Sequence, residues 1–507
     1  MLSEITFGII GLAIFAYTLQ WIISTFDDAR EPQRVNSSIP LFGHLLGMLR
    51  DGPDYYSTAS KATNADIFTL HVLGTKLYIS KTHRLTTAIQ KSSKTLSFKP
   101  FIKTASQKLG GAGDDTLKLF TDDFLDDFSH AMKSTLGPGP DLDAQNMRMG
   151  KRVLVDIDEL TNGASTVVKL HQWTMHAVVQ ASSCGVFGEK HPYLDQKVED
   201  AFWTWQSYVL QHFANLDFTR KGYAARETVF KAFKTYCRKL PLDVAPVIAE
   251  RQRVLLEGGV SEDNAAQQQA TFSVAAFANT TPTLYWTIHE LYARPDLLAA
   301  VRKEVISTAV SGSHEKGFAL DVSALKTKCP LTLSVFQETQ RTRNIHANIR
   351  KVTEDTLLDG KYLLKKGHFL QMPGGPVHHE RTTWGPTADT FDPYRFVPAP
   401  AVSGQGTKRS VPQSSFISWG APPHLCPARQ FATTEILIVV ALLAVRVDIE
   451  PMKGEWVLQP PVQKADLVTL HNPKKDVEVR VRRREKWEGK WGLKMGESTT
   501  RVSLASG

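Results

Sequence analysis

Cys426 stands where its sulfur could act as a metal ligand. It follows residues 416–423, which are too rich in Pro and Gly to be helical, and precedes Pro427 and an apolar stretch that ends near Leu443. The pattern predicts a helix beginning just after the cysteine, so that unpaired N–H groups and the positive end of the helix dipole stabilise a thiolate. His424 could donate a hydrogen bond to an anionic group of a large planar cofactor that carries the metal. The alternative is a buried free thiol beside a core helix.

A second candidate site lies inside a helix predicted over residues 261–292. Pro282 has no N–H to offer the carbonyl of Ala278, and its ring pushes against that carbonyl. The helix should therefore open by one turn at Asn279 and Thr280, leaving room for a small ligand or a water molecule. The alternative is a kinked core helix without a ligand.

Several charged residues recur at spacings that could support such a site. Glu338 and Arg341 lie three positions apart, hence on one face of a helix predicted over residues 330–343. Alone, such a pair is usually a solvated ion pair of little energetic worth. Arg395 lies further along the chain, in the motif of residues 391–396. Arg350 lies at the start of a predicted strand, and the alternative interpretation is that it is an ordinary surface arginine.

Taken together, these segments resemble the cytochrome P450, or haem-thiolate, superfamily. The cysteine loop has an aromatic residue, a glycine, a basic residue two before the cysteine, and then Pro-x-Arg-x-Phe-Ala. Trp419 stands where most members have Phe, and Pro422 where most have Gly. The Trp-Gly-Ala opening and the Asn-Thr-x-Pro of the helix resemble the prostacyclin synthase and sterol 7α-hydroxylase branch.

The resemblance implies a role for each candidate. Cys426 would be the axial ligand of the iron of haem b, and Thr280 would take the position of the family's catalytic alcohol. Asn279 would take the position usually held by Asp or Glu, next to that alcohol. The other matches are cofactor-binding residues and a structural charge cluster: Trp419, His424 and Arg350 for the former, Glu338, Arg341 and Arg395 for the latter.

The fold implied is mainly α with small β-sheets, namely the cytochrome P450 fold as one large catalytic domain. We expect that domain over residues 46–487, with a hairpin at 67–79 and late strands at 445–449 and 476–481. Residues 27–45 read as a proline-containing hinge, and residues 488–507 as a loosely ordered tail. His130 and Lys133, in a helix predicted over 120–136, fit a solvated face as well as a cofactor contact, and neither is assigned.

Residues 5–23 are nearly all apolar and uncharged, close to the ~20 residues that span a bilayer core. No basic segment precedes them and no small-x-small cleavage site follows. We therefore expect residues 1–26 to form an uncleaved transmembrane anchor. The expected location is the endoplasmic reticulum membrane, single-pass, with the catalytic domain in the cytosol.

The net charge of +9 suggests an anionic membrane surface or an acidic protein as a partner. Nucleic acid is disfavoured because the basic residues are spread along the chain without an aromatic-interleaved patch. The four cysteines lie far apart, which argues against zinc and against a disulfide framework, and for a reducing compartment.

The function implied by the resemblance is a monooxygenase that oxidises a hydrophobic small molecule, a terpenoid, steroid or alkaloid, in fungal secondary metabolism. Its electrons would come from NADPH through a separate flavoprotein reductase, because the chain has no Gly-x-Gly-x-x-Gly or flavin segment. Two alternatives stay open. One is a haem-thiolate isomerase or dehydratase that needs neither O2 nor reductase, and the other is a haem sensor or carrier without turnover.

Overall fold

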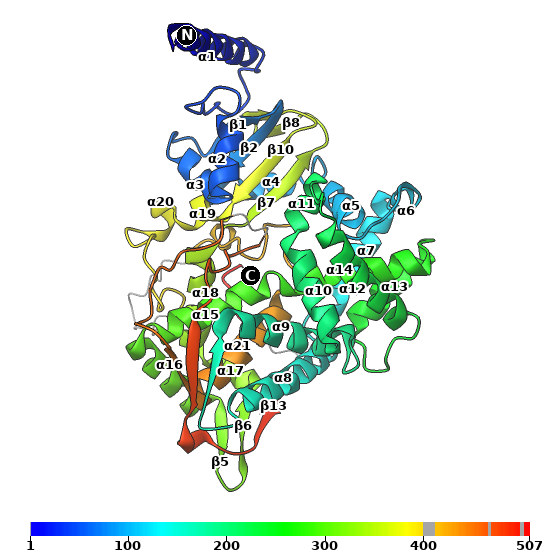
Figure 1. The fold of residues 1–507 in the computed structure, drawn as a ribbon, viewed down its shortest axis with the longest axis vertical. Coiled ribbons are helices and arrows are strands. Elements are labelled where there is room, and N and C mark those ends of the chain that lie inside the picture. The colour runs from blue at the N-terminus through cyan, green and yellow to red at the C-terminus, as the bar shows by residue number, and fades with distance from the viewer. Residues whose placement is uncertain (1, 399–410, 465–467, 497–500, 507) are drawn as a thin grey trace.

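The fold is mainly helical, with a small sheet region beside the N-terminal helix (Figure 1). The computed structural model describes residues 2–398, 411–464, 468–496 and 501–506, and the side chains of residues 2–10, 12 and 13 lie outside the description. The helices of the described residues are α1 (Leu2–Thr25), α2 (Gly43–Asp51), α3 (Asp54–Ser60), α4 (Thr86–Lys91), α5 (Lys99–Lys108), α6 (Asp114–Leu119), α7 (Asp122–Thr135), α8 (Pro140–Leu160), α9 (Leu170–Phe187), α10 (Gln196–Ser207), α11 (Val209–Ala214), α12 (Lys221–Cys237), α13 (Pro246–Glu257), α14 (Glu262–Phe277), α15 (Thr280–Tyr292), α16 (Pro295–Thr308), α17 (Val322–Lys328), α18 (Pro330–Arg343), α19 (Gly374–His378), α20 (Arg381–Trp384) and α21 (Arg429–Arg446).

The strands form small sheets. They are β1 (Ile67–Val72), β2 (Thr75–Ser80), β3 (Leu96–Ser97), β4 (Ser165–Lys169), β5 (Val310–Ser313), β6 (Gly317–Asp321), β7 (Ala347–Val352), β8 (Thr356–Leu358), β9 (Tyr362–Leu364), β10 (Phe369–Pro373), β11 (Val447–Pro451), β12 (Glu478–Arg483) and β13 (Trp491–Lys494). The largest has the order β1-β2-β10-β7-β3, and the expected hairpin is its β1–β2 pair, turning at Leu73 and Gly74. The late strands β11 and β12 each begin two residues after their predicted starts, and β11 does so because α21 continues to Arg446.

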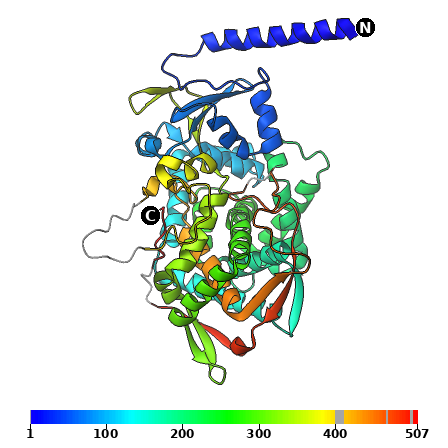
Figure 2. The ribbon, with the colours of Figure 1, turned by 90° about the vertical axis from the view of Figure 1, so that its left-hand side faces the viewer.

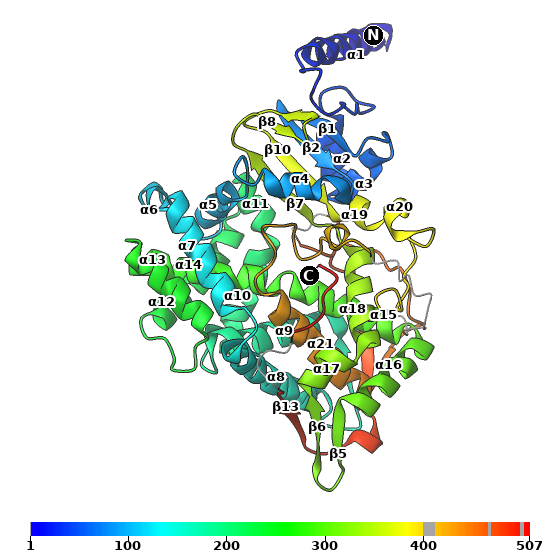
Figure 3. The ribbon, with the colours of Figure 1, turned by 180° about the vertical axis from the view of Figure 1, so that it is seen from behind.

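The core of the helical part is built around α21, which is buried along almost its whole length. It packs against α8, α15, α16, α17 and α18, so apolar side chains are needed on all of its faces. The main hydrophobic cluster includes α8 and α21 and excludes the five-stranded sheet, which has its own small cores. The cysteine loop precedes α21 and lies between these helices and the sheet (Figure 3).

The predicted break in the long helix is confirmed. Ser261 caps α14, its side chain accepting a hydrogen bond from the N–H of Asn264, and α14 ends at Phe277. The helix resumes as α15 at Thr280, two residues before Pro282. The opening is thus placed where the proline removes a backbone donor.

The prediction of a loosely ordered tail was wrong for the parts of residues 488–507 that are described. Strand β13 pairs in parallel with β6, and Val502 and Leu504 are buried. The N–H of Val502 donates to Gln430 of α21, and the N–H of Ala505 donates to Gln337 of α18. The described end of the chain therefore packs against α18 and α21. Strand β13 was not predicted because it is short and lies among charged residues, so it shows no recognisable alternation of apolar and polar positions.

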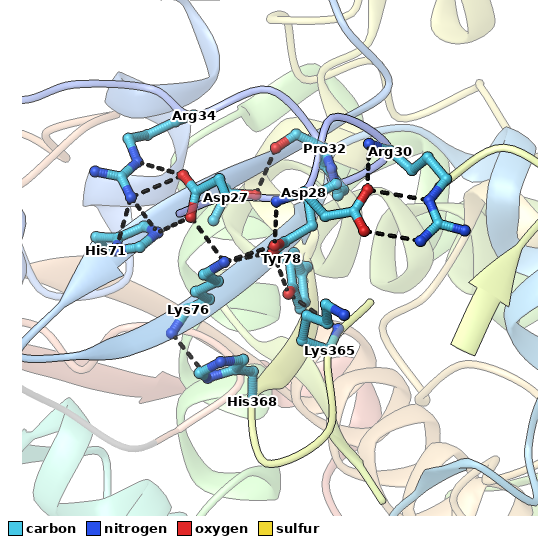
Figure 4. Close-up of polar contacts among 12 residues, drawn as sticks. Asp27, Asp28, Arg30, Pro32, Arg34, His71, Lys76, Tyr78, Lys365 and His368 are labelled. Carbon is cyan, nitrogen blue, oxygen red and sulfur yellow. Dashed lines mark hydrogen bonds and ion pairs between the residues drawn. The ribbon is translucent and has the colours of Figure 1, made fainter. Parts of the chain in front are cut away.

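The segment after α1 is a fixed part of the sheet region (Figure 4). The N–H of Val35 donates to the carbonyl of Thr69, and the N–H of Thr69 to that of Gln33, so this segment runs beside β1. Asp27 pairs with Arg34 and Lys76 of β2, at 2.8 Å each. A second carboxylate, that of Glu31, pairs with the same Lys76 at 2.7 Å and accepts from the hydroxyl of Tyr78 at 2.8 Å.

Helix α1 lies outside the main body, beyond the sheet (Figure 2). Within the part of the chain that the structure describes, no helix combines the length and the apolar character needed to cross a membrane. The anchor expected at residues 5–23 falls partly on side chains outside that description, and it stays a prediction.

Candidate active site

The loop before α21 is closed on itself by a backbone hydrogen bond. The N–H of Cys426 donates to the carbonyl of Trp419 at 2.7 Å, and the carbonyl of Cys426 accepts from Arg429 Nη1 at 3.1 Å. Gly420 has a φ of 95°, and a Cβ there would lie 2.6 Å from the carbonyl oxygen of His424. Only glycine fits, which explains this residue of the motif. The loop therefore fixes Cys426 just before α21, which begins at Arg429.

The electrostatics of Cys426 differ from the prediction. Burial raises the pKa of its thiol, and the N–H of Ala428 and the charge of Arg429 only partly oppose that effect. The helix N-terminus is therefore insufficient to hold a thiolate. A cation bound directly at the sulfur would reverse the balance, because a coordinating thiol is deprotonated outright.

Cys426 and His346 are half-buried, so each keeps part of its surface accessible within the fold. On α14, Ala275 is exposed and Ala276 half-buried, although α9, α12 and α13 pack on this helix. Asn279 is half-buried one turn further on, so these residues mark one accessible helix face that ends at the break.

Arg350 carries a buried charge without a carboxylate partner among the described residues. Its side chain is 2% exposed and donates to the backbone carbonyls of Ile349 and Ala421, at 2.8 and 2.9 Å. Burial lowers its pKa to about 10, and no nearby anion opposes this. An unpaired buried cation is costly, so an anionic ligand group is the compensation that the arrangement lacks.

His424 lies in the same positive field. Burial, then the charges of Arg350, Lys133 and Lys99, lower the pKa of His424 to about 4, so the imidazole is neutral near pH 7. Its ring packs against Phe98, 5.6 Å away between ring centroids. The neutral ring keeps one N–H donor, and Lys133 is brought close enough to add its charge.

Trp419 is partly buried and packs against Phe336 of α18. Its indole N–H is enclosed and has no hydrogen-bond partner in the part of the chain that is described. A thiol held at a fixed place, an unpaired guanidinium, a neutral histidine and an unpartnered indole N–H together fit a metal-carrying planar cofactor with anionic groups.

The predicted charge cluster forms. Arg341 makes two parallel hydrogen bonds to Glu338, both at 2.8 Å, and Arg395 donates to the same carboxylate at 3.1 Å. Glu338 and Arg341 are fully buried. The N–H of Asp392 also donates to Glu338, at 2.9 Å. The cluster therefore joins α18 to the segment before the cysteine loop. All of these contacts are with other protein groups.

His378 connects this cluster to the cysteine loop, and the sequence analysis missed it. Its carbonyl accepts from Arg341 at 2.6 Å, and its ring Nε2 accepts from the N–H of Ile417 at 3.0 Å. The ring also stacks on Phe416. Burial and the Arg341 charge lower the pKa of His378 well below its usual value, which keeps Nε2 an acceptor. No sequence pattern distinguishes this histidine from its neighbour His379.

At the helix break, hydroxyl groups satisfy two backbone carbonyls. Thr280 donates to the carbonyl of Ala276 at 2.8 Å, and Thr283 donates to that of Asn279 at 2.7 Å. The side-chain oxygen of Asn279 accepts from the N–H of Thr469 at 2.9 Å. The Asn279 amide therefore bonds to the backbone of Thr469, and no hydrogen bond from its nitrogen to the carbonyl of Ala278 is found among the described residues.

Comparisons with known proteins agree with this site. The sequence profile of the cytochrome P450 family matches residues 34–479. Cytochrome P450 monooxygenase nodJ of Hypoxylon pulicicidum is 32% identical over 512 residues, covering 98% of each chain. Cytochrome P450 7B1 of Mus musculus is 22% identical, covering 83% of this chain and 85% of its own. The haem domain of a cytochrome P450DA mutant has a TM-score of 0.68 at 17% identity, covering 90% of this chain and 98% of its own, which supports the fold.

The family assignment rests on agreement along the whole chain. The profile covers the helix break, the charge cluster and the cysteine loop, in that order. Haem b is the cofactor of this family, and the residues around Cys426 suit it. The chain therefore belongs to the cytochrome P450 family and is a haem-dependent monooxygenase.

Proposed function

We propose that Cys426 is the axial ligand of the haem iron and that the enzyme oxidises a hydrophobic terpenoid, steroid or alkaloid in fungal secondary metabolism. The observation that carries the proposal is the juxtaposition of an enclosed thiol and the unpaired, buried Arg350 at one loop. Bound haem b supplies O2 activation, and a thiolate ligand favours O–O cleavage. Fungal relatives named as monooxygenases support the pathway class.

The protein's own residues would hold and orient the reactants. Arg350 and His424 would face the anionic groups of the cofactor, and Trp419 would add an N–H donor. Thr280 would order a water and pass protons through its hydroxyl, once that hydroxyl turns from the carbonyl of Ala276. The three-membered charge cluster would keep the cysteine loop in shape and take no part in the chemistry.

The electron source we propose is NADPH, through a separate membrane flavoprotein reductase. We place the enzyme on the endoplasmic reticulum membrane, single-pass, with its catalytic domain in the cytosol. The uncharged residues 5–23 support an anchor. Contacts from the end of α1 support a defined orientation, since Tyr17 donates to the carbonyl of Ser38 and Gln20 accepts from the N–H of Leu41.

A second function is favoured by one observation. Asn279 stands where the family has an acid, and an amide cannot donate protons to bound oxygen near neutral pH. A haem-thiolate isomerase or dehydratase, which acts on an activated substrate without O2 or reductase, needs no such acid.

One experiment separates the two functions. The full-length enzyme, reconstituted with reductase in lipid vesicles, is screened for a substrate-induced spectral shift across terpenoids, steroids and alkaloids. Product that requires NADPH and reductase supports the monooxygenase. Thr280→Ala should then keep haem and substrate binding and release peroxide in place of product. Turnover without reductase, unaffected by Thr280→Ala, would establish the isomerase.

A further inference from the structure

The break in the central helix is tied to a segment nearly two hundred residues away in sequence. Asn279 accepts a hydrogen bond from the N–H of Thr469, at 2.9 Å. The carbonyl of Thr469 accepts from the N–H of Ile345, also at 2.9 Å. The carbonyl of His471 accepts from the indole N–H of Trp286 at 2.7 Å. Residues 468–471 are therefore held by hydrogen bonds to the broken helix on one side and to the segment before β7 on the other.

This segment packs against the broken helix. Val468 packs with Ala278 of the break and with Ile345 in an apolar cluster separate from the main core. Thr469 is half-buried, like Asn279, whereas the residues on either side of it are buried. The position of Val468 therefore depends on how the backbone of Thr469 is held.

The chemistry of the bond fixes the orientation of the Asn279 amide. A backbone N–H can only donate, so the atom that faces Thr469 must be the carbonyl oxygen. The Nδ2 group then points away, and it has no hydrogen-bond partner within the described residues. An aspartate would keep an acceptor toward Thr469 and would replace this free donor by a second acceptor.

We propose that Asn279 is a positioning residue, which sets the place of residues 468–471 against the substrate through its bond to Thr469. On this view its amide selects how the substrate lies over the iron, and it takes no part in proton delivery. The inference rests on the proposed function, since it requires the accessible face of α14 to border the bound substrate.

The test uses two azole probes on the full-length, haem-loaded enzyme. Imidazole and 4-phenylimidazole both bind iron through nitrogen, and only the second needs the space beside the iron. The measurement is the ratio of their dissociation constants, with peroxide released per NADPH as a second readout. Asn279→Ala and Thr469→Pro remove the same bond from its two sides. Thr283→Val perturbs the same helix break without touching residues 468–471, and is the matched control.

We expect Asn279→Ala and Thr469→Pro to change the ratio in the same direction, by about three- to tenfold for one lost hydrogen bond. Asn279→Asp and Thr283→Val should stay within about twofold of the parent, because the bond to Thr469 is kept. Peroxide release in Asn279→Asp should equal that of the parent. A change in Asn279→Asp as large as that in Asn279→Ala would overturn the proposal.

If Thr469→Pro does not retain haem, the comparison of Asn279→Asp with Asn279→Ala is sufficient to test the proposal. Both of these variants keep the native sequence of residues 468–471. Failure of the proposed function would look different. The parent enzyme would then lack the red-shifted Soret band of its reduced carbonyl complex. A normal band with silent Asn279 variants would reject only the positioning role.

Discussion

Cys426 illustrates how an enclosed thiol depends on what binds it. Burial raises its pKa, so the sulfur becomes a thiolate only when a cation compensates the charge. Burial likewise raises the pKa of Cys184 to about 11 and that of Cys329 to about 12, but Cys184 lies within α9 and Cys329 directly precedes α18. The identity of the iron ligand can therefore be tested cysteine by cysteine.

We expect Cys426→His to abolish the red-shifted Soret band of the reduced carbonyl complex, because that band requires a thiolate ligand. Cys184→Ser is the control and should leave the band unchanged. The measurement is the carbonyl difference spectrum of each purified protein. Retention of both the band and the activity in Cys426→His would show that another cysteine binds the iron.

Arg350 offers a sharper test of the cofactor geometry. Because its buried charge lacks a protein anion, Arg350→Met should leave the haem-free protein at least as stable as the parent. The same change should speed haem loss by about tenfold or more, if a charge-assisted hydrogen bond of ~1.5–3 kcal/mol is lost. Thermal unfolding and haem transfer to an excess of apomyoglobin measure the two effects.

Arg302→Met is the control for that experiment. Arg302 donates to the backbone of α21 and pairs with Asp448, so its loss should lower stability and leave the haem-transfer rate unchanged. A destabilised haem-free Arg350→Met with normal haem retention would instead make Arg350 a structural residue of the sheet.

Glu435 gives a prediction for pH. It is buried within α21, and burial raises its pKa to about 8 from 4.5, although the hydroxyl of Ser182 donates to it at 2.7 Å. Between these values the unfolded chain loses a proton that the folded chain retains. The free energy of unfolding therefore falls as pH rises from about 4.5 to 8, and levels above that.

We expect Glu435→Gln to remove this component. The variant should match the parent near pH 5 and should be more stable at pH 8, by up to a few kcal/mol on the scale of ~1.4 kcal/mol per unit of pKa. Glutamine keeps an acceptor for Ser182, so packing is little changed. Thermal unfolding at the two pH values measures the difference. Equal pH dependence in both proteins would mean that Glu435 is ionised when folded.

At the level of elements, the charge cluster joins α18, the segment 387–395 and the cysteine loop. Arg341 alone holds the Glu338 carboxylate and the carbonyls of His378, Ala388 and Thr390. Through His378 this arrangement reaches the N–H of Ile417, at the start of the loop. From the sequence alone, Glu338 and Arg341 resemble an ion pair on a helix surface. In the structure they are buried and connect three segments of the chain.

Arg341→Ala should therefore yield little or no haem-loaded protein. It leaves Glu338 buried with only part of its compensation, at a cost on the order of 3–5 kcal/mol. Arg341→Lys should rescue little, since a lysine cannot reproduce the paired hydrogen bonds or reach all the carbonyls. The ratio of haem to protein after purification is the measurement. Normal haem content with lost turnover would make the cluster catalytic.

Across the whole molecule, local signals were predictable and pairings between distant segments were not. Ser261 placed the start of the long helix and Pro282 its break, and residue spacing placed the charge cluster and the cysteine loop. The partner of Asn279 and the role of His378 depend on residues far along the chain, which no local pattern encodes. The strand near the C-terminus and the packing of the segment after α1 were not predicted either. Both segments carry charged residues, which in a sequence resemble those of a solvated loop.

The segment after α1, which contains Asp27, Glu31 and Arg34, determines how far the chain can be shortened when α1 is removed. A chain that begins at Asp27 keeps the ion pairs to Arg34 and Lys76, and should fold and bind haem like the full-length protein (Figure 4). A chain that begins at Asn36 loses Asp27, Glu31 and the pairing beside β1. Because Glu31 is nearly buried against Lys76, the shorter chain should lose several kcal/mol, on the order of the 3–5 expected for a broken buried pair.

Thermal unfolding and haem content of the two chains measure the effect, with Glu31→Gln in the full-length protein as the matched control for the Lys76 pair. The shorter chain should be the less stable of the two, and the control should fall between it and the parent. Equal stability would show that the segment only links α1 to the domain. Carbonate extraction of full-length protein tests the anchor separately, because a spanning helix resists carbonate, whereas an electrostatically held protein is released. Release of the full-length protein would leave the segment's role in folding intact and remove the case for a transmembrane α1.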